Sequence, residues 1–151
     1  MPGDATHLVV SVGGNDALMN RDVLAAPVSS TAEDLELFRE RAGEFESAYR
    51  RAIGRVLRLS LPAILCTIYN GDLPGDEGRI ATIALRIFND AIIRTAIEHG
   101  LDVIELRLVC SERADYANPI EPSGAGGRKI AQAIFRAVSR TDGDAATLVF
   151  R

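Results

Sequence analysis

The stretch LVVSVGGNDAL, residues 8–18, decides how we interpret the fold of this chain. It begins with an apolar run rich in valine, which is typical of a strand inside a β-sheet. The run stops at Gly13 and Gly14, and Asn15 and Asp16 follow at once. Ligands bind beyond the carboxyl ends of the strands in open α/β sheets. The stretch therefore predicts an amide and a carboxylate beside a ligand site.

Two further apolar runs resemble the first, and helical patterns separate all three. Each run is short, rich in Val, Ile and Leu, and typical of a strand buried on both faces. We predict these strands at His7–Val12, Ala63–Tyr69 and Val103–Cys110, with a final edge strand within Ala146–Phe150. Strands that alternate with helices favour an α/β fold with a parallel sheet and right-handed crossovers.

The helical segments have recognisable ends. An N-cap precedes the first helix, supplied either by Thr31 with Asp34 or by Ser30 with Glu33. Ser123 is best explained as a cap or turn residue before the last helix. Apolar residues recur at helical spacing after these caps. We predict helices over residues 32–59, 78–99 and 126–140.

Length and composition limit what the chain can be. Its 151 residues form one domain, 1–151, and the 47 % hydrophobic content indicates a folded globular protein. The net charge is −4 and no basic arm is present, which argues against nucleic-acid binding. No leader-like or membrane-spanning apolar segment is recognisable, so we predict a cytoplasmic protein. Cys66 and Cys110 then read as buried reduced thiols.

Asn15 is the first candidate for chemistry. A side-chain amide in such a turn can donate its N–H to an oxygen that becomes negative when an ester is attacked. The alternative is an Asx-turn, in which Asn15 or Asp16 only satisfies nearby backbone groups. Nothing fixes the separation of Asp16, Asp72 and Asp115, so we do not predict a metal site from them.

Two motifs resemble the SGNH, or GDSL-type, ester hydrolases. VVSVGGNDAL is similar to the Gly-x-Asn-Asp block of that family, and NPIEPSGAGGRKIA resembles its last block, Asp-x-x-His-Pro-Ser. The resemblance implies a three-layer, flavodoxin-like parallel sheet and hydrolysis of an ester or acyl group without a cofactor. By this match Asn15 is the oxyanion-hole asparagine, and Gly13 opens the same turn.

The last block departs from the family pattern at both catalytic positions. Glu121 stands where the family has its catalytic His, and Asn118 stands where it has Asp. A carboxylate can act as a general base when burial raises its pKa, so Glu121 is a candidate base; the alternative is a solvated glutamate at a helix entrance. Neither His7 nor His99 is expected in the site.

The family's Gly-Asp-Ser nucleophile block is missing from this sequence. It should precede the Gly-x-Asn-Asp block by a strand and two helices, so the resemblance implies a sheet that lacks its first strands and helices. The serines that are present do not lie in a strand–turn–helix elbow with a histidine nearby. We therefore expect little esterase activity from this chain alone.

Three functional hypotheses remain. The first is an SGNH-type hydrolase that acts on a small-molecule ester or acyl substrate, with its nucleophile supplied from outside this sequence. The second is a non-catalytic binding or assembly module built on the same scaffold. The third is a generic α/β domain in which Gly13–Asp16 is only a turn.

The first predicted strand also bears on assembly. Without the family's front strands, Leu8–Val12 forms an unpaired sheet edge with no lysine or proline to discourage pairing. We therefore predict self-association through this strand, or marginal stability.

Overall fold

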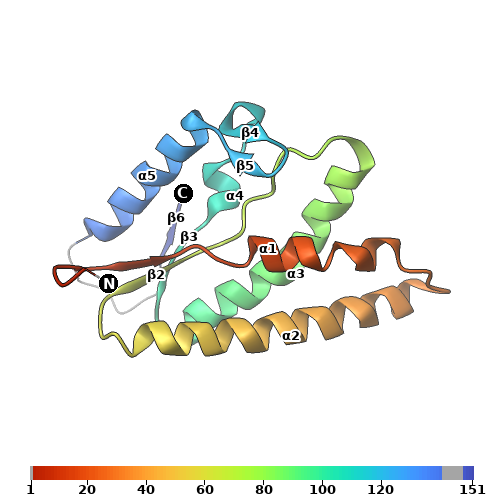
Figure 1. Cartoon of the computed structure of the whole chain (residues 1–151), viewed down its shortest axis with the longest axis horizontal. Coiled ribbons are helices and arrows are strands. Elements are labelled where there is room, and N and C mark those ends of the chain that lie inside the picture. Colours follow the sequence, from red (N-terminus) through yellow and green to blue (C-terminus); the bar gives the residue numbers. More distant parts are fainter. Residues whose placement is uncertain (1, 141–147) are drawn as a thin grey trace.

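A computed structural model describes residues 2–140 and 148–151 and has a parallel sheet at its centre. The sheet contains β1 (Leu8–Val10), β2 (Ala63–Cys66), β3 (Asp102–Ile104) and β6 (Val149–Phe150), in the order β1-β2-β3-β6. All three strand pairings are parallel, as Figure 1 shows. The predicted α/β class and the final edge strand are confirmed, although residues 146 and 147 lie outside the described part.

One predicted strand is partly wrong. Val103–Cys110 was expected to be a single strand, but β3 ends at Ile104 and the chain then forms the short helix α4 (Leu106–Val109). The Glu105 side chain accepts the Arg107 N–H, which caps this helix. An apolar run of this length fits a strand and a buried helical turn equally well, and the polar contacts of Glu105 decide between them.

The other strands are shorter than expected, and β1 differs in burial. β2 is buried throughout, as predicted, because strands pair with it on both sides and helices cover both faces. All three residues of β1 are only half-buried. The prediction that β1 is buried on both faces is wrong because it lies at an edge of the sheet.

The three long helices are confirmed, with small shifts at their ends. They are α2 (Thr31–Leu57), α3 (Gly75–Glu98) and α5 (Gly124–Val138). Of the two caps considered for α2, the structure has Ser30, whose hydroxyl accepts the Glu33 N–H. Ser123 caps α5 in the same way, as predicted. Both ends of α3 are set by backbone turns, so it begins at Gly75 rather than Gly78.

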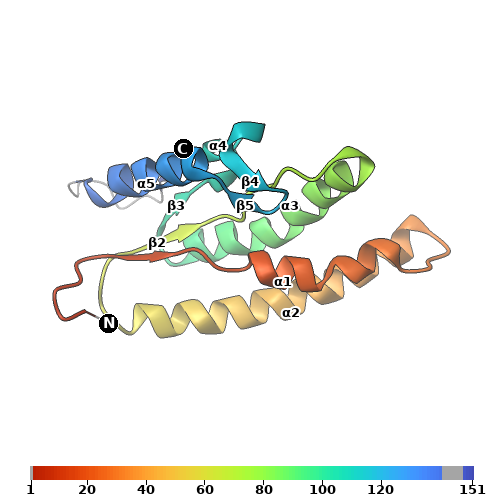
Figure 2. The same ribbon diagram turned by 45° about the horizontal axis from the view of Figure 1, so that its top comes forward.

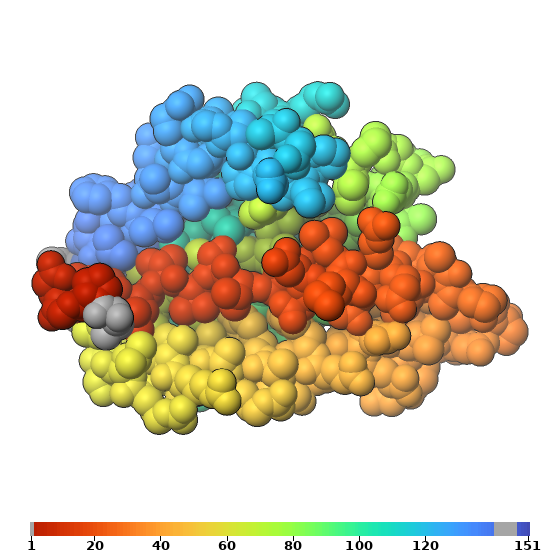
Figure 3. All heavy atoms as spheres, viewed as in Figure 1, coloured from red at the N-terminus to blue at the C-terminus, as the bar shows by residue number. Residues whose placement is uncertain are grey.

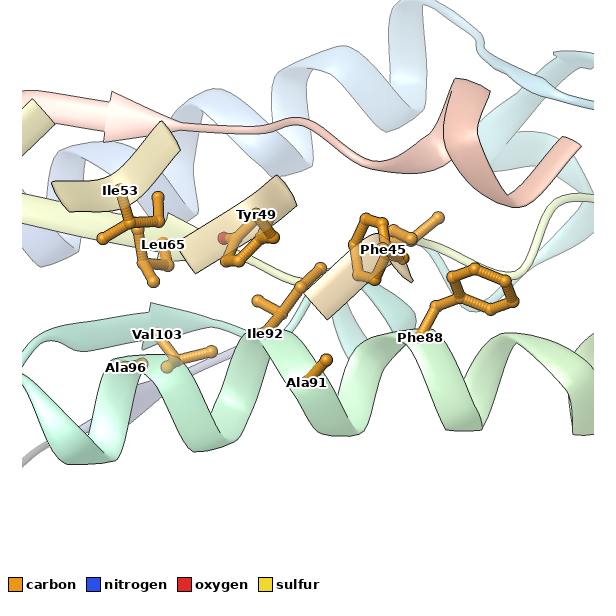
Figure 4. Close-up of a cluster of buried hydrophobic side chains, with 10 residues drawn as sticks. Phe45, Tyr49, Ile53, Leu65, Phe88, Ala91, Ile92, Ala96 and Val103 are labelled. Atoms are coloured by element: carbon orange, nitrogen blue, oxygen red, sulfur yellow. The ribbon is translucent and has the colours of Figure 1, made fainter. Parts of the chain in front are cut away.

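Helices pack on both faces of the sheet, and a hydrophobic cluster lies under each face. α2 and α3 contribute Phe45, Tyr49, Phe88 and Ile92 to the cluster in Figure 4. α5 covers the other face, as Figure 2 makes visible. It contributes Ala133 and Ala137 to the cluster there.

Both cysteines are buried free thiols, as expected. Burial is the main reason that the pKa of Cys66 is raised to about 11. A buried thiol with a raised pKa is a poor nucleophile at neutral pH, so Cys66 contributes packing rather than chemistry. In the described part of the chain, no helix is both long enough and apolar enough to cross a membrane.

Several short elements beyond the strand ends were not predicted. They are α1 (Gly14–Met19), the 3-10 turns η1 (Arg21–Ala25) and η2 (Arg113–Asp115), and the antiparallel pair β4 (Tyr116–Asn118) and β5 (Glu121–Pro122). All of them lie beyond the carboxyl ends of β1, β2 and β3, at the same end of the molecule (Figures 1 and 2). Of these elements, α1, η1 and the β4–β5 turn border the site described next.

Candidate functional site

A groove of about 1010 Å³ opens beyond the carboxyl ends of β1 and β2. One wall is α1 with η1, the other is the first half of α3, and the β4–β5 turn closes one end. Phe38, Ile68, Leu85 and Phe88 give it an apolar lining. In Figure 3 the yellow-green segment after β2 lies recessed between the orange α1 and the cyan β4–β5 turn.

Gly13 directs the chain from β1 into the groove wall. Its φ of 112° lies in the region that favours glycine, and it is buried. A Cβ atom at this position would lie 3.1 Å from the Phe45 ring and 3.4 Å from the Ile68 side chain. Only glycine therefore lets β1 end close to the core and turn immediately into α1, which carries Asn15.

Asn15 lines the groove from the first turn of α1 and is exposed. Neither Asn15 nor Asp16 caps the helix with its side chain, so the Asx-turn alternative does not describe this turn. The amide that does bond locally is Asn20, which donates to the Asp16 carbonyl oxygen at 2.9 Å. Within the described residues the Asn15 amide makes no hydrogen bond. Its donors are free for a ligand.

Glu121 lines the same groove from the β4–β5 turn at its end and is also exposed. Asn118 pairs with it across the β4–β5 turn and donates from Nδ2 to a Glu121 carboxylate oxygen at 2.7 Å. The Asn118 Oδ1 atom accepts the backbone N–H groups of Ile120 and Glu121 at 3.0 and 2.9 Å. Asn118 itself does not line the groove, so it positions Glu121 rather than contacting a ligand there.

The β4–β5 turn is attached to the chain that leaves β2. The Tyr69 hydroxyl donates to the Ile120 carbonyl at 2.9 Å, and the Asp72 N–H donates to the Pro119 carbonyl at 2.8 Å. Gly71 fits against Pro119 because a Cβ atom there would lie 2.6 Å from the Pro119 carbonyl oxygen. These contacts bring Glu121 to the groove. The Asn-Gly dipeptide at 70–71 is a turn signal, but it does not reveal the partner.

Two further asparagines near the groove were not predicted as site residues. Asn89 is fully buried on α3, where it accepts the Ile68 N–H at 2.7 Å and donates to the Ile68 carbonyl at 2.9 Å. The Asn89 side chain thus makes the two hydrogen bonds to Ile68 that a neighbouring strand would otherwise make. It holds the backbone of Ile68 in place at the floor of the groove. Asn70 lines the groove, and its buried Oδ1 atom has no hydrogen-bond partner among the described residues.

A buried polar cluster lies beyond the end of β3. Glu105 accepts hydrogen bonds from the Thr67 hydroxyl and the Arg107 guanidinium, both at 2.7 Å. Burial raises the pKa of Glu105, but these hydrogen bonds outweigh it and leave the pKa lowered. The Glu105 carboxylate is therefore charged and occupied, which suits a structural role in holding β2 and β3 together.

The acidic residues of the loop before β4 are paired with cations. Lys129 contacts the buried Asp115 at 2.8 Å and Glu112 at 3.2 Å. Arg113 lies 3.6 Å from Asp72 on the neighbouring loop. Among the residues that the structure describes, no cluster of His, Cys, Asp and Glu is arranged to hold a metal ion.

The groove contains one serine and no histidine among its described lining residues. That serine, Ser11, is hydrogen-bonded to the Cys66 thiol rather than to a base. His7 lies before β1, at the opposite end of the strand from Asn15, and His99 follows the last residue of α3. The described residues therefore do not assemble a serine–histidine pair.

Comparison of the chain with protein-family models, with curated proteins and with solved structures gave no match in any of the three. The resemblance of the two motifs to SGNH hydrolases therefore remains a prediction from the sequence.

Proposed function

We propose that this chain provides the oxyanion and base side of an SGNH-type hydrolase site for a small-molecule ester or acyl substrate. The observation that carries the proposal is that Asn15 and Glu121, matched from motifs at opposite ends of the sequence, line one groove. The free Asn15 amide and the hydrogen bond from Asn118 to Glu121 support it.

The chemistry follows from these positions. A hydroxyl oxygen attacks the carbonyl carbon, and the carbonyl electron pair moves onto oxygen, where the Asn15 N–H donates to it. Glu121 accepts the proton from the attacking hydroxyl, and Asn118 holds its carboxylate in place. The intermediate then collapses, the bond to the leaving oxygen or nitrogen breaks, and Glu121 returns the proton to that atom. Water releases the acyl group from the serine in the same two steps. The hydroxyl is a serine supplied from outside residues 1–151, because Ser11 has no base beside it.

The same proposal gives the sheet a finer description. In the flavodoxin-like order 2-1-3-4-5, β1, β2 and β3 take the third, fourth and fifth positions. Their adjacency in chain order and their parallel pairing support this assignment. β6 then extends the sheet beyond the fifth position.

A second candidate is a non-catalytic binding module that uses the same groove. The absence of histidine among the described lining residues and the exposure of Glu121 favour it. This module would bind apolar ligands through Phe38, Leu85 and Phe88 without depending on the Asn15 amide. The two candidates therefore differ in what Asn15 contributes to binding.

The test uses a phosphonate monoester, a tetrahedral anion that resembles the intermediate of ester hydrolysis. Calorimetric titration of the whole chain measures its affinity. A hydrogen bond to a charged group contributes about 1.5–3 kcal/mol, so Asn15→Ala should weaken binding at least tenfold. Glu121→Gln should strengthen binding, because it removes a negative charge from the groove.

Asn20→Ala is the matched control. Asn20 lines the same groove, but its amide is already bonded to the Asp16 carbonyl, so affinity should change less than twofold. Equal affinities of wild type and Asn15→Ala would contradict the hydrolase proposal and favour the binding module.

A further inference from the structure

Neither polar atom of the Asn70 side chain is hydrogen-bonded to a described residue. Asn70 lines the groove from the segment after β2, which Figure 3 shows recessed between α1 and the β4–β5 turn. Its Oδ1 atom is buried, whereas its Nδ2 atom is not, so the two N–H groups are open to a ligand. A buried polar atom without a partner lowers stability, and its presence in a groove calls for an explanation.

The local turn does not explain this side chain. In an Asx-turn the side-chain oxygen of Asn70 would accept the N–H of Asp72, two residues further on. That N–H donates instead to the Pro119 carbonyl at 2.8 Å. Gly71, with a φ of 77°, provides the left-handed residue of the turn. The Asn70 amide is therefore not used by the turn in which it lies.

The backbone on both sides of Asn70 is nevertheless held in place. Asn89 is hydrogen-bonded to both the N–H and the C=O of Ile68, two residues before Asn70. On the other side, the Asp72 N–H is bonded to the Pro119 carbonyl. A donor on a fixed backbone needs little reorganisation when negative charge develops beside it, and this is what stabilises a charged transition state.

Asn70 has the position after β2 that Asn15 has after β1. The two strands are parallel, with Val10 opposite Leu65, and Asn15 and Asn70 each follow five residues later. The carboxyl ends of neighbouring parallel strands lie at the same edge of a sheet. Both asparagines line the groove that opens at this edge.

The two segments remain in contact after the strands end. A Cβ atom on Gly13 would lie 3.4 Å from the Ile68 side chain, and one on Gly14 would lie 3.8 Å from it. Asn15 directly follows Gly14, and Asn70 comes two residues after Ile68. The fold therefore brings two unbonded side-chain amides to one end of the groove.

We propose that Asn70 is the second oxyanion donor, so that the Nδ2 groups of Asn15 and Asn70 donate together to the carbonyl oxygen as it becomes negative. This inference rests on the proposed hydrolase function. Because Oδ1 is the buried end of the Asn70 amide, a ligand meets the Nδ2 end, and a donor suits an anion.

Calorimetric titration of the whole chain with two ligands of the same carbon skeleton tests the proposal. One is the phosphonate monoester, which is negatively charged, and the other is its uncharged methyl diester. Hydrogen bonds to charged groups are the stronger ones, so Asn70→Ala should weaken monoester binding by about tenfold or more and diester binding by only about twofold. A structural role of Asn70 would weaken both equally, and that result would overturn the proposal.

Asn20→Ala is again the matched control. Asn20 lines the same groove with its amide already bonded to the Asp16 carbonyl, so its loss should change the affinity for either ligand less than about twofold. A loss of monoester affinity in Asn15→Ala but not in Asn70→Ala would overturn this inference and leave the proposed function standing. No monoester binding by wild type, or no loss in either variant, would overturn both.

A measurement on the wild-type chain keeps the proposal testable if Asn70→Ala unfolds. The Asn70 side-chain N–H signals are assigned by NMR through their bonds to the Asn70 backbone. One of them should shift downfield as the monoester binds and should stay in place with the diester. Signals that remain unmoved when the monoester saturates the chain would overturn the inference.

Discussion

The side-chain amide of Asn118 donates a 2.7 Å hydrogen bond to the carboxylate of Glu121, while its oxygen accepts two backbone N–H groups of the same turn. One side chain thus shapes the β4–β5 turn and orients the acidic group that faces the groove. In the SGNH pattern the two positions hold an Asp and a His. Asn118 and Glu121 are also hydrogen-bonded to each other, but here the negative charge is on the second residue, Glu121, rather than on the first.

Asn118→Asp should destabilise the chain more than Asn118→Ala at pH 7. The new carboxylate would still accept the turn's N–H groups but would face the Glu121 carboxylate. Loss of these exposed hydrogen bonds in Asn118→Ala should lower the free energy of unfolding by about 1–2 kcal/mol. Urea denaturation measures both variants. The difference should shrink in high salt, which screens the repulsion between exposed charges; a difference that does not depend on salt would contradict repulsion.

Gly13→Ala should lower the free energy of unfolding by about 1–3 kcal/mol, because it forces a Cβ into a left-handed conformation against Phe45. Gly43→Ala is the control. Gly43 lies inside α2 with open space where a Cβ would stand, so alanine should stabilise the chain by about 0.5–1 kcal/mol. Thermal unfolding compares the two. If both substitutions shift Tm in the same direction, the close approach at Gly13 does not constrain the chain.

Stability should fall in acid partly through Asp115. The ion-paired hydrogen bond from Lys129 is the main reason that the pKa of Asp115 is lowered below its ordinary value of about 3.9. A lowered folded-state pKa stabilises the protein above the unfolded value, and this contribution is lost as pH falls through the folded-state pKa.

We therefore expect Asp115→Asn to have a lower Tm than wild type at pH 7, with the gap closing as pH falls below the ordinary Asp pKa of about 3.9. Asp90→Asn, which breaks an exposed ion pair with Arg94, should change Tm little at any pH. A gap that stays constant down to pH 2 would show that the Asp115 charge does not stabilise the fold.

This chain alone should hydrolyse p-nitrophenyl esters poorly. Without an activated nucleophile it keeps only binding and oxyanion stabilisation, which contribute a few kcal/mol of the barrier. Release of p-nitrophenolate, measured beside a mock purification, gives the rate. If the wild-type chain turns the ester over, and both Asn15→Ala and the mock sample do not, then a nucleophile is already present in the chain.

The parts of the fold that follow from local pattern were predictable. A cap at Ser30 or Thr31, the three long helices and the apolar cores of the strands are all encoded by residue spacing. The run 103–110 was predicted wrongly because its helical turn depends on Glu105, whose partner Thr67 lies on another strand. Strand ends were placed too late because apolar residues continue past them into the groove.

The candidate site, too, could be predicted from the sequence only in part. Asn15 could be singled out because strand, glycines and amide are adjacent in the sequence. Tyr69 and Asn89 could not, because each acts on a backbone group of the folded chain that no sequence pattern reports. That Glu121 reaches the groove follows from the contacts of the β4–β5 turn with Tyr69 and Asp72, which exist only after folding.

The most direct test of the central claim is the NMR signal of the Asn15 side-chain amide during titration with the phosphonate monoester. Comparison with Asn15→Ala assigns the signal. The proposal predicts that one of the two Nδ2 protons shifts downfield and saturates together with binding, as expected for donation to an oxyanion. Saturable binding with the Asn15 amide signal unmoved would contradict the assignment of Asn15 as the oxyanion donor.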